Sequence, residues 1–170
     1  MLRKLKDKGY LEFSALPDHV LRNSDQQFTP AEVEKSFHAG TYCLDSNPEK
    51  ECFMQYITSS KVKKVYFTGM FTSHQGDLSV QYCDPESRRV RQYYPDFFAE
   101  MEDGTNQLIE VKGDNKINNA VVRAKAEAAI DMATAGGVEY KIYAGSVLMS
   151  SKILEPSTVL RNMQETVDLS

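Results

Sequence analysis

Apolar residues occur in short runs along the middle of the chain, and two neighbouring runs form the clearest pair. Residues 94–100 and 108–113 are both short and rich in apolar side chains, which predicts two buried strands. Between them, residues 103–106 have the composition of a tight turn. The pattern therefore predicts a β-hairpin, and the rest of the chain is interpreted around it.

Three ionisable residues interrupt this hairpin: Asp96, Glu110 and Lys112. Glu110 and Lys112 stand two residues apart on one strand and should point to the same face. Asp96 opens the first strand, so antiparallel pairing brings it to the end where the second strand closes. Two carboxylates suit a divalent cation such as Mg²⁺, and an ammonium beside them could hold a water or help deprotonate it.

The remaining periodicity predicts helices and strands on both sides of the hairpin. Helices are expected after a Thr29-Pro30 start and over residues 48–59 and 117–135. Strands are expected over residues 62–71, 78–83, 89–94 and 140–144. The second and third of these should pair and extend the sheet beside the central hairpin, and the last should lie parallel to the strand that carries Glu110.

The spacing of the charged residues matches a known family. Pro95-Asp96, a gap of 13 residues and then Glu110-Val111-Lys112 resembles the PD-(D/E)xK nuclease superfamily. The segment YYPDFFAEMEDG and the later segment LIEVKG are most similar to the C-terminal endonuclease domain of type III restriction enzymes and related helicase-nucleases. The resemblance implies a restriction-endonuclease-like α/β fold with an αβββαβ core, in which helices flank a mixed central sheet.

That core would cover about residues 46–145 of a single domain spanning 1–170, with 1–45 and 146–170 as accessory segments. One interpretation of the start of the chain is a short helix. The end of the chain is expected to form a helix after Pro156. The resemblance also places a glutamate at the start of the first core helix, where it completes the acidic cluster. Glu49 is the match and Glu51 the second choice, and the alternative for Glu49 is a purely capping role at the positive end of that helix.

Composition limits the possible functions without choosing one. No apolar run approaches the length of a membrane span, so a cytoplasmic, intracellular protein is expected. The three cysteines and three histidines lack the spacing of a zinc site or a disulfide framework. No GxxxxGK[ST] phosphate loop is present, so a motor, if one is needed, lies on another chain.

A net charge of −4 argues against a strong free-standing nucleic-acid binder, but the basic residues are clustered. Basic runs lie near the start of the chain, over residues 61–64 and over residues 88–91. Arg88, Arg89 and Arg91 directly precede the strand of Asp96 and are candidates for phosphate contacts, as Lys125 is on the long helix. Solvated strand edges and a packed or exposed helix face are the alternatives.

The sequence therefore predicts a nuclease dependent on Mg²⁺ or Mn²⁺ that cuts phosphodiester bonds, with DNA as the expected polymer. Asp96 and Glu110 would hold the metal together with the Val111 carbonyl, Lys112 would orient the attacking water, and Glu49 could hold a metal-bound water. Two alternatives stay open: an inactive nucleic-acid-binding or assembly module of the same fold, and an RNA-processing nuclease. A homodimer or partner subunits could supply a second site for cutting both strands.

Overall fold

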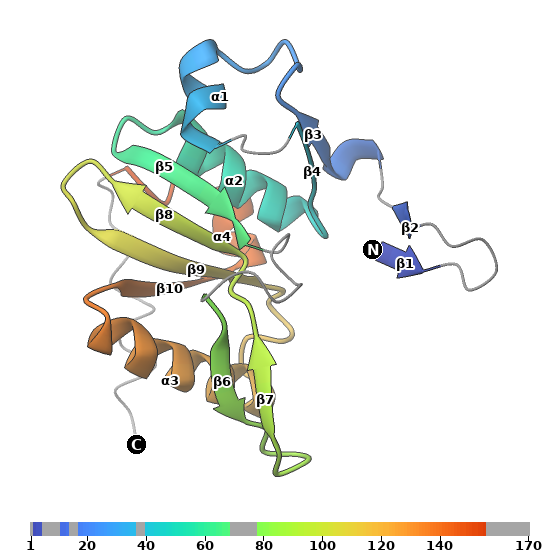
Figure 1. The fold of residues 1–170 in the computed structure, drawn as a ribbon, viewed down its shortest axis with the longest axis vertical. Helices are drawn as coiled ribbons and strands as arrows, with labels where there is room; N and C mark the ends of the chain where they lie inside the picture. The colour runs from blue at the N-terminus through green and yellow to red at the C-terminus, as the bar shows by residue number, and fades with distance from the viewer. Residues whose placement is uncertain (1, 5–10, 14–16, 37–39, 69–77, 156–170) are drawn as a thin grey trace.

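A four-stranded mixed sheet forms the centre of the protein (Figure 1). The computed structural model describes residues 2–4, 11–13, 17–36, 40–68 and 78–155. The strands of the sheet, in spatial order, are β10 (Glu139–Ala144), β9 (Asn106–Lys112), β8 (Phe97–Met101) and β5 (Val62–Phe67). β8 pairs antiparallel with both β5 and β9, and β10 pairs parallel with β9, as predicted. The β8–β9 turn contains Gly104 at a φ of 87°, a conformation that glycine adopts at no steric cost.

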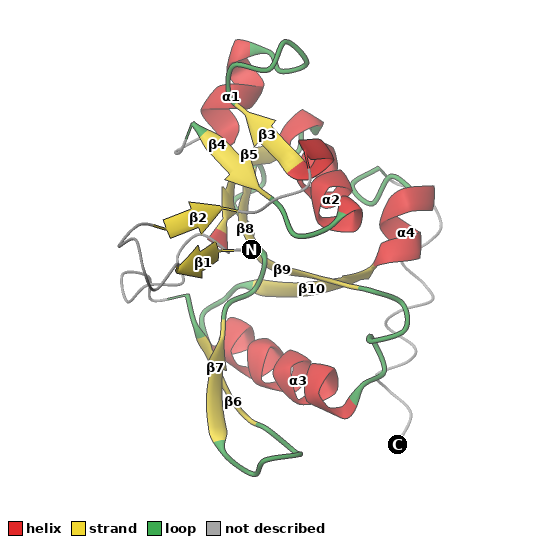
Figure 2. Ribbon diagram, turned by 90° about the vertical axis from the view of Figure 1, so that its right-hand side faces the viewer, coloured by secondary structure: helices red, strands yellow, loops and turns green. Residues whose placement is uncertain are grey.

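Helices cover both faces of this sheet (Figure 2). One face carries α2 (Asn47–Thr58) and α4 (Gly145–Ser150), and the opposite face carries α3 (Ala120–Ala135). The apolar residues of α2 pack on the sheet in one hydrophobic core, in which Phe53, Tyr56 and Ile57 are buried and Met54 is partly buried. Its large members include Phe53, Tyr56, Phe97 and Ile109. The result is the predicted α/β architecture with three layers, consistent with a restriction-endonuclease-like fold.

The hairpin of β6 (Val80–Cys83) and β7 (Val90–Tyr93) exists as predicted, but its predicted place in the sheet is wrong. The two strands form a sheet of their own and pack on α3. The physical reason is a second small core, in which side chains from the hairpin are buried against Ala129 of α3. Burying these apolar groups on the helix competes with backbone pairing at the sheet edge, and the helix contact prevails.

The helices agree with their predicted boundaries to different degrees. α1 (Pro30–Ser36) begins where predicted, because Thr29 and Glu32 form a reciprocal capping box. α3 begins three residues later than predicted, since the Asn119 side chain caps it by accepting from the Val121 amide at 2.8 Å. α4 was not predicted at all. The expected helix after Pro156 lies outside the described residues.

Short strands and one 3-10 turn make up the described residues at the start of the chain. β1 (Leu2–Lys4) pairs with β2 (Leu11–Phe13), and β3 (Val20–Arg22) pairs with β4 (Thr41–Cys43). A single 3-10 turn, η1 (Pro17–His19), precedes β3. None of the helices in the described ranges is both long and apolar enough to cross a lipid bilayer.

Candidate active site

Strand pairing places Asp96 and Glu110 side by side at one end of the sheet. Phe97 of β8 pairs with Ile109 of β9, so the next position of the same ladder sets Asp96 opposite Glu110. On its other side Asp96 is fixed to the end of β5, because its carbonyl accepts from the Thr68 amide at 3.0 Å. The two carboxylates therefore come from neighbouring backbone segments that are held on both sides.

Asp96 is half-buried in an environment that disfavours its charge. Its Oδ2 accepts a hydrogen bond of 2.7 Å from the Val111 amide, which ties the side chain to β9. Burial, and next the negative charge of Glu110, raise the pKa of Asp96 to about 8, and these effects exceed the opposing influence of Lys112. Without a bound cation this carboxyl group holds its proton near neutral pH.

Glu110 is more deeply buried, with 3% of its surface exposed. Its Oε1 forms an ion pair with Lys112, whereas its Oε2 is buried and has no hydrogen-bond partner among the described residues. Burial raises the pKa of Glu110 even though Lys112 opposes that rise. A buried carboxylate oxygen without a partner is costly, and a cation at this point would satisfy it.

Lys112 leaves the same face of β9 as Glu110, as the two-residue spacing predicts. Burial alone would lower the pKa of Lys112, but the neighbouring Glu110 and Asp96 carboxylates outweigh it and raise that pKa. The ammonium group therefore stays charged beside the acidic pair.

The donor set fits Mg²⁺ without a dedicated cage. Within the described ranges no cluster of three or more histidine, cysteine, aspartate or glutamate side chains is arranged to hold a metal ion. Mg²⁺ usually keeps several waters and binds proteins through only one or two carboxylates. Asp96 and Glu110 supply two carboxylates, one of them with a free buried oxygen. The Val111 carbonyl stays a predicted third ligand.

Glu49 adopts the capping role that was the alternative to metal binding. Its Oε1 accepts from the Ser46 hydroxyl and its Oε2 from the Asp45 amide, both at 2.9 Å, while its own amide donates to Ser46 Oγ at 3.3 Å. These contacts form a capping box at the start of α2. Burial nevertheless raises the pKa of Glu49, and Lys112 is close enough to oppose that rise. Glu49 thus stands beside the acidic pair, and a role toward metal-bound water stays a prediction.

Lys125 of α3 lies near the site in a cage of aromatic rings that the sequence reading missed. Its Nζ is 5.4 Å from the ring centre of Tyr82 and 5.0 Å from that of Tyr93. The Tyr93 hydroxyl donates to the Lys125 carbonyl at 3.1 Å and also bonds with Tyr140 of β10. The positive charge of Lys125 opposes the rise in the pKa of Glu110 that burial causes. Alternation along the predicted hairpin arms was the available signal, since Tyr82 and Tyr93 occupy inward positions.

The basic runs differ in what they contact. In the 61–64 run each lysine has a partner: Lys61 and Lys64 donate to backbone carbonyls, and Lys63 lies 3.9 Å from Glu100. In the hairpin run the Arg91 Nε lies 2.7 Å from Asp84 Oδ2. Arg88 and Arg89 are exposed, and the described residues offer neither of them an ion pair. Of the predicted phosphate contacts, these two arginines remain available.

Comparison with known proteins agrees with this geometry. A family model described as TnsA-like endonuclease N terminal matches residues 53–145 of the 170, a span that contains the whole central sheet and α3. No curated protein and no solved structure matches the chain. The predicted membership of the PD-(D/E)xK superfamily is confirmed at this level. The narrower likeness to type III restriction enzymes stays a prediction that the match does not support.

Proposed function

The chain belongs to the TnsA-like endonuclease N-terminal family, and on that premise we propose that it is a DNA endonuclease that depends on Mg²⁺ or Mn²⁺. The observation that carries the metal dependence is the pair formed by half-buried Asp96 and buried Glu110. Burial and the charge of Glu110 raise the pKa of Asp96, and burial raises the pKa of Glu110. One Glu110 oxygen is also buried without a hydrogen-bond partner among the described residues, so the protein alone satisfies this pair poorly. A divalent cation would supply the missing positive charge.

The roles of the residues follow from their contacts. A bound cation would neutralise charge on the phosphate and stabilise the leaving oxygen. Asp96 and Glu110 would hold it, with the Asp96 carboxylate oriented by the Val111 amide. Lys112, whose ammonium now rests against Glu110, would turn toward the attacking water or the scissile phosphate when a cation takes over the pairing of Glu110.

Incubation with supercoiled plasmid, single-stranded DNA and RNA tests this function directly. Each substrate is offered with Mg²⁺, with Mn²⁺ and with chelator, and the Asp96→Asn variant serves as a control because asparagine can still accept from the Val111 amide. We expect DNA cleavage by the native protein with metal only, and none by the variant. Cleavage that persists in chelator, or equal cleavage by both proteins, would contradict the proposal.

The same assay addresses assembly. One acidic pair cuts one strand, so we propose that a second copy or a partner subunit supplies the site for the other strand. Dilute protein should produce nicked circles. Linear product should increase with protein concentration if a second copy is sufficient, whereas nicking alone at every concentration would indicate a separate partner.

A further inference from the structure

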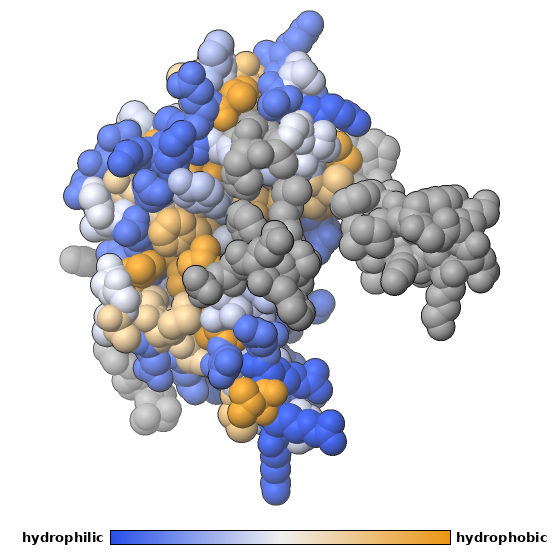
Figure 3. All heavy atoms as spheres, viewed as in Figure 1, coloured by the Kyte–Doolittle hydropathy of each residue, from blue (hydrophilic) through white to orange (hydrophobic). Residues whose placement is uncertain are grey.

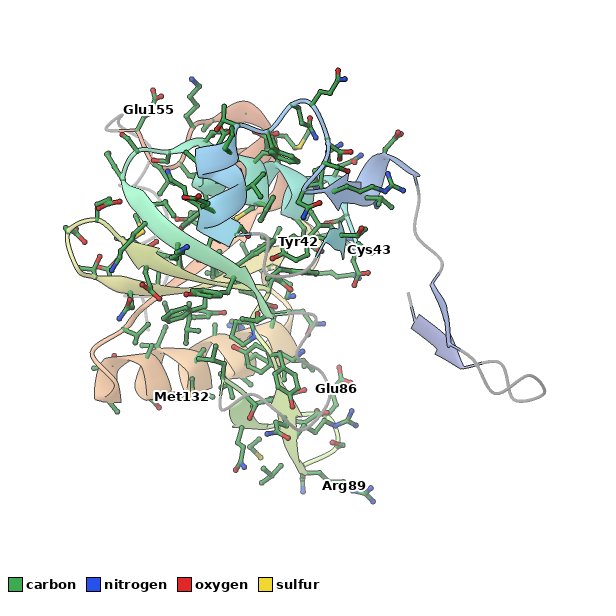
Figure 4. The ribbon with its side chains drawn as sticks, turned by 45° about the horizontal axis from the view of Figure 1, so that its top comes forward. Tyr42, Cys43, Glu86, Arg89, Met132 and Glu155 are labelled. Carbon is green, nitrogen blue, oxygen red and sulfur yellow. The ribbon has the colours of Figure 1, made fainter. Side chains whose placement is uncertain are left out.

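The β6–β7 hairpin forms an arm that projects beyond the central sheet. Figures 1 and 4 show it extending away from the layers, with Arg89 at its far end and directed outward. Its base is anchored, because Val80, Tyr82 and Tyr93 are buried against α3. Beyond that base β7 is exposed at Val90, Arg91 and Gln92. The outer part of the arm therefore packs on no other element among the described residues.

Asp84 fixes the shape of the turn at the end of this arm. Its side chain is only 7% exposed, and Oδ1 accepts from the amides of Glu86 and Ser87 at 2.9 and 3.2 Å. Its backbone amide donates to the Arg89 carbonyl at 2.9 Å, and its carbonyl accepts from the Arg88 amide at 2.8 Å. The ion pair of Asp84 with Arg91 closes the set. The Asp84 carboxylate thus holds three neighbouring residues, and the Asp84 backbone holds two more.

Arg88 occupies a backbone conformation that arginine rarely adopts. Its φ is 54°, and it is the only non-glycine residue with positive φ in the described ranges. Glycine or asparagine would take this left-handed position at lower cost. An arginine held there against its own preference points to a use for its side chain.

The end of the arm presents charge and a small apolar group to solvent. Arg88 and Arg89 are exposed, and Val90 beside them is 73% exposed. Figure 3 shows mainly hydrophilic residues over this end of the molecule, whereas apolar residues gather over β8 and β9. Two unpaired guanidinium groups beside one apolar side chain are complementary to an anionic partner that also carries apolar groups.

We propose that the β6–β7 hairpin enters the major groove of duplex DNA, with Arg88 and Arg89 directed at base edges and Val90 available to a thymine methyl group. This inference rests on the proposed DNA endonuclease function and extends it to how the substrate is held. The major groove of B-form DNA admits a two-stranded β-ribbon, and arginine pairs there with guanine O6 and N7. The major groove of A-form RNA is too narrow for side chains to read, so the arm selects DNA over duplex RNA.

The arm also fixes the groove contact relative to the site of cleavage. Tyr93 joins β7 to Lys125 and Tyr140, next to the acidic pair, so the arm does not swing independently of the site. Arg88 lies eight positions before Asp96. Eight extended residues span at most about 27 Å. At roughly 3.4 Å per nucleotide along one strand, the bases touched by the arm should lie within about eight nucleotides of the cut.

Binding to duplex DNA in chelator, measured by fluorescence anisotropy over a series of salt concentrations, tests the arm without cleavage. Arg88→Gly suits this experiment, because glycine favours the turn while the substitution removes the guanidinium group. We expect its melting temperature to be unchanged or a few degrees higher and its affinity to fall about tenfold or more, with Arg89→Ala behaving alike in affinity. Arg22→Ala, which removes an exposed arginine on β3, is the matched control and should bind normally.

Methylation protection identifies the groove. With the native protein bound, guanine N7 within about eight nucleotides of the cut should be protected from dimethyl sulfate, and Arg88→Gly should lose that protection. Equal affinity and protection for native protein and both arginine variants would overturn the inference even if cleavage is normal. Protection of guanine N7 by a protein that cleaves nothing would support the arm while refuting the proposed endonuclease. Protection only of adenine N3, in the minor groove, would contradict the groove assignment.

Discussion

At the scale of single residues, the charge of Asp96 decides how the metal-free protein responds to pH. Its folded-state pKa of about 8 lies above the unfolded value of roughly 4. Between these values the folded protein binds more protons than the unfolded chain, so the free energy of unfolding contributed by this group decreases as pH rises toward 8 and stays low above it. Below about pH 4 the group carries no such penalty.

The Asp96→Asn variant should remove that pH dependence. In chelator we expect the variant to be more stable than the native protein at pH 7, by at least about 1 kcal/mol, and the difference to shrink as pH falls toward 4. Denaturant unfolding of both proteins at pH 4.5, 6, 7 and 8 measures this difference. A constant difference across the series would mean that Asp96 is ionised throughout, contrary to the burial argument.

A substitution of Lys112 distinguishes the cleavage step from metal binding, because an ammonium group is not a metal ligand. Lys112→Ala should lower the cleavage rate by at least about a hundredfold and leave the affinity for Mn²⁺ largely intact. Lys116→Ala, which removes an exposed lysine from the loop that follows, should cleave at the native rate. If the Lys112 variant cleaved normally, the role assigned to the lysine would be wrong.

At the scale of elements, α2 shows how one side chain can serve both a helix and a site. Glu49→Gln keeps the capping box, since the amide oxygen can accept from Asp45 and the amide nitrogen can donate to Ser46, but it removes the negative charge. We expect a melting temperature within a few degrees of the native value and cleavage slowed about tenfold or more. Native cleavage by this variant would restrict Glu49 to capping.

Local signals predicted those elements whose neighbours along the chain decide their structure. The Gly104 turn, the Thr29 capping box and the periodicity of α2 and α3 are all short-range, and the structure contains each of them. The meeting of Asp96 and Glu110 at one end of the hairpin also followed from antiparallel pairing. Where long-range contacts compete, prediction failed: the second hairpin left the sheet because α3 offered its apolar groups a better surface.

The details of the site were beyond sequence reasoning for the same reason. That Glu110 keeps one unpaired oxygen, that Lys125 rests on Tyr82 and Tyr93, and that Arg88 adopts a positive φ all depend on how separate elements meet. Residue types and spacing indicated which chemistry was available.

At the scale of the whole molecule, the sheet, α2 and α3 together hold an acidic pair that the metal-free protein tolerates at a cost in stability. Ligand binding to the folded state alone stabilises it by mass action. The central claim is therefore that a divalent cation binds at Asp96 and Glu110 and stabilises the folded protein. A measurement of folding stability detects this effect without any substrate.

Thermal unfolding of the native protein and of Asp96→Asn at pH 7, each in chelator and in excess Mg²⁺ or Mn²⁺, tests the claim most directly. In chelator the variant should unfold at the higher temperature, because neutral asparagine needs no proton beside Glu110, whereas burial and the Glu110 charge force Asp96 to take one up on folding. With metal the native protein should gain several degrees and the variant much less. A variant that is less stable than the native protein in chelator and gains as much from metal would show that Asp96 is a structural residue at a strand end, and would contradict the account.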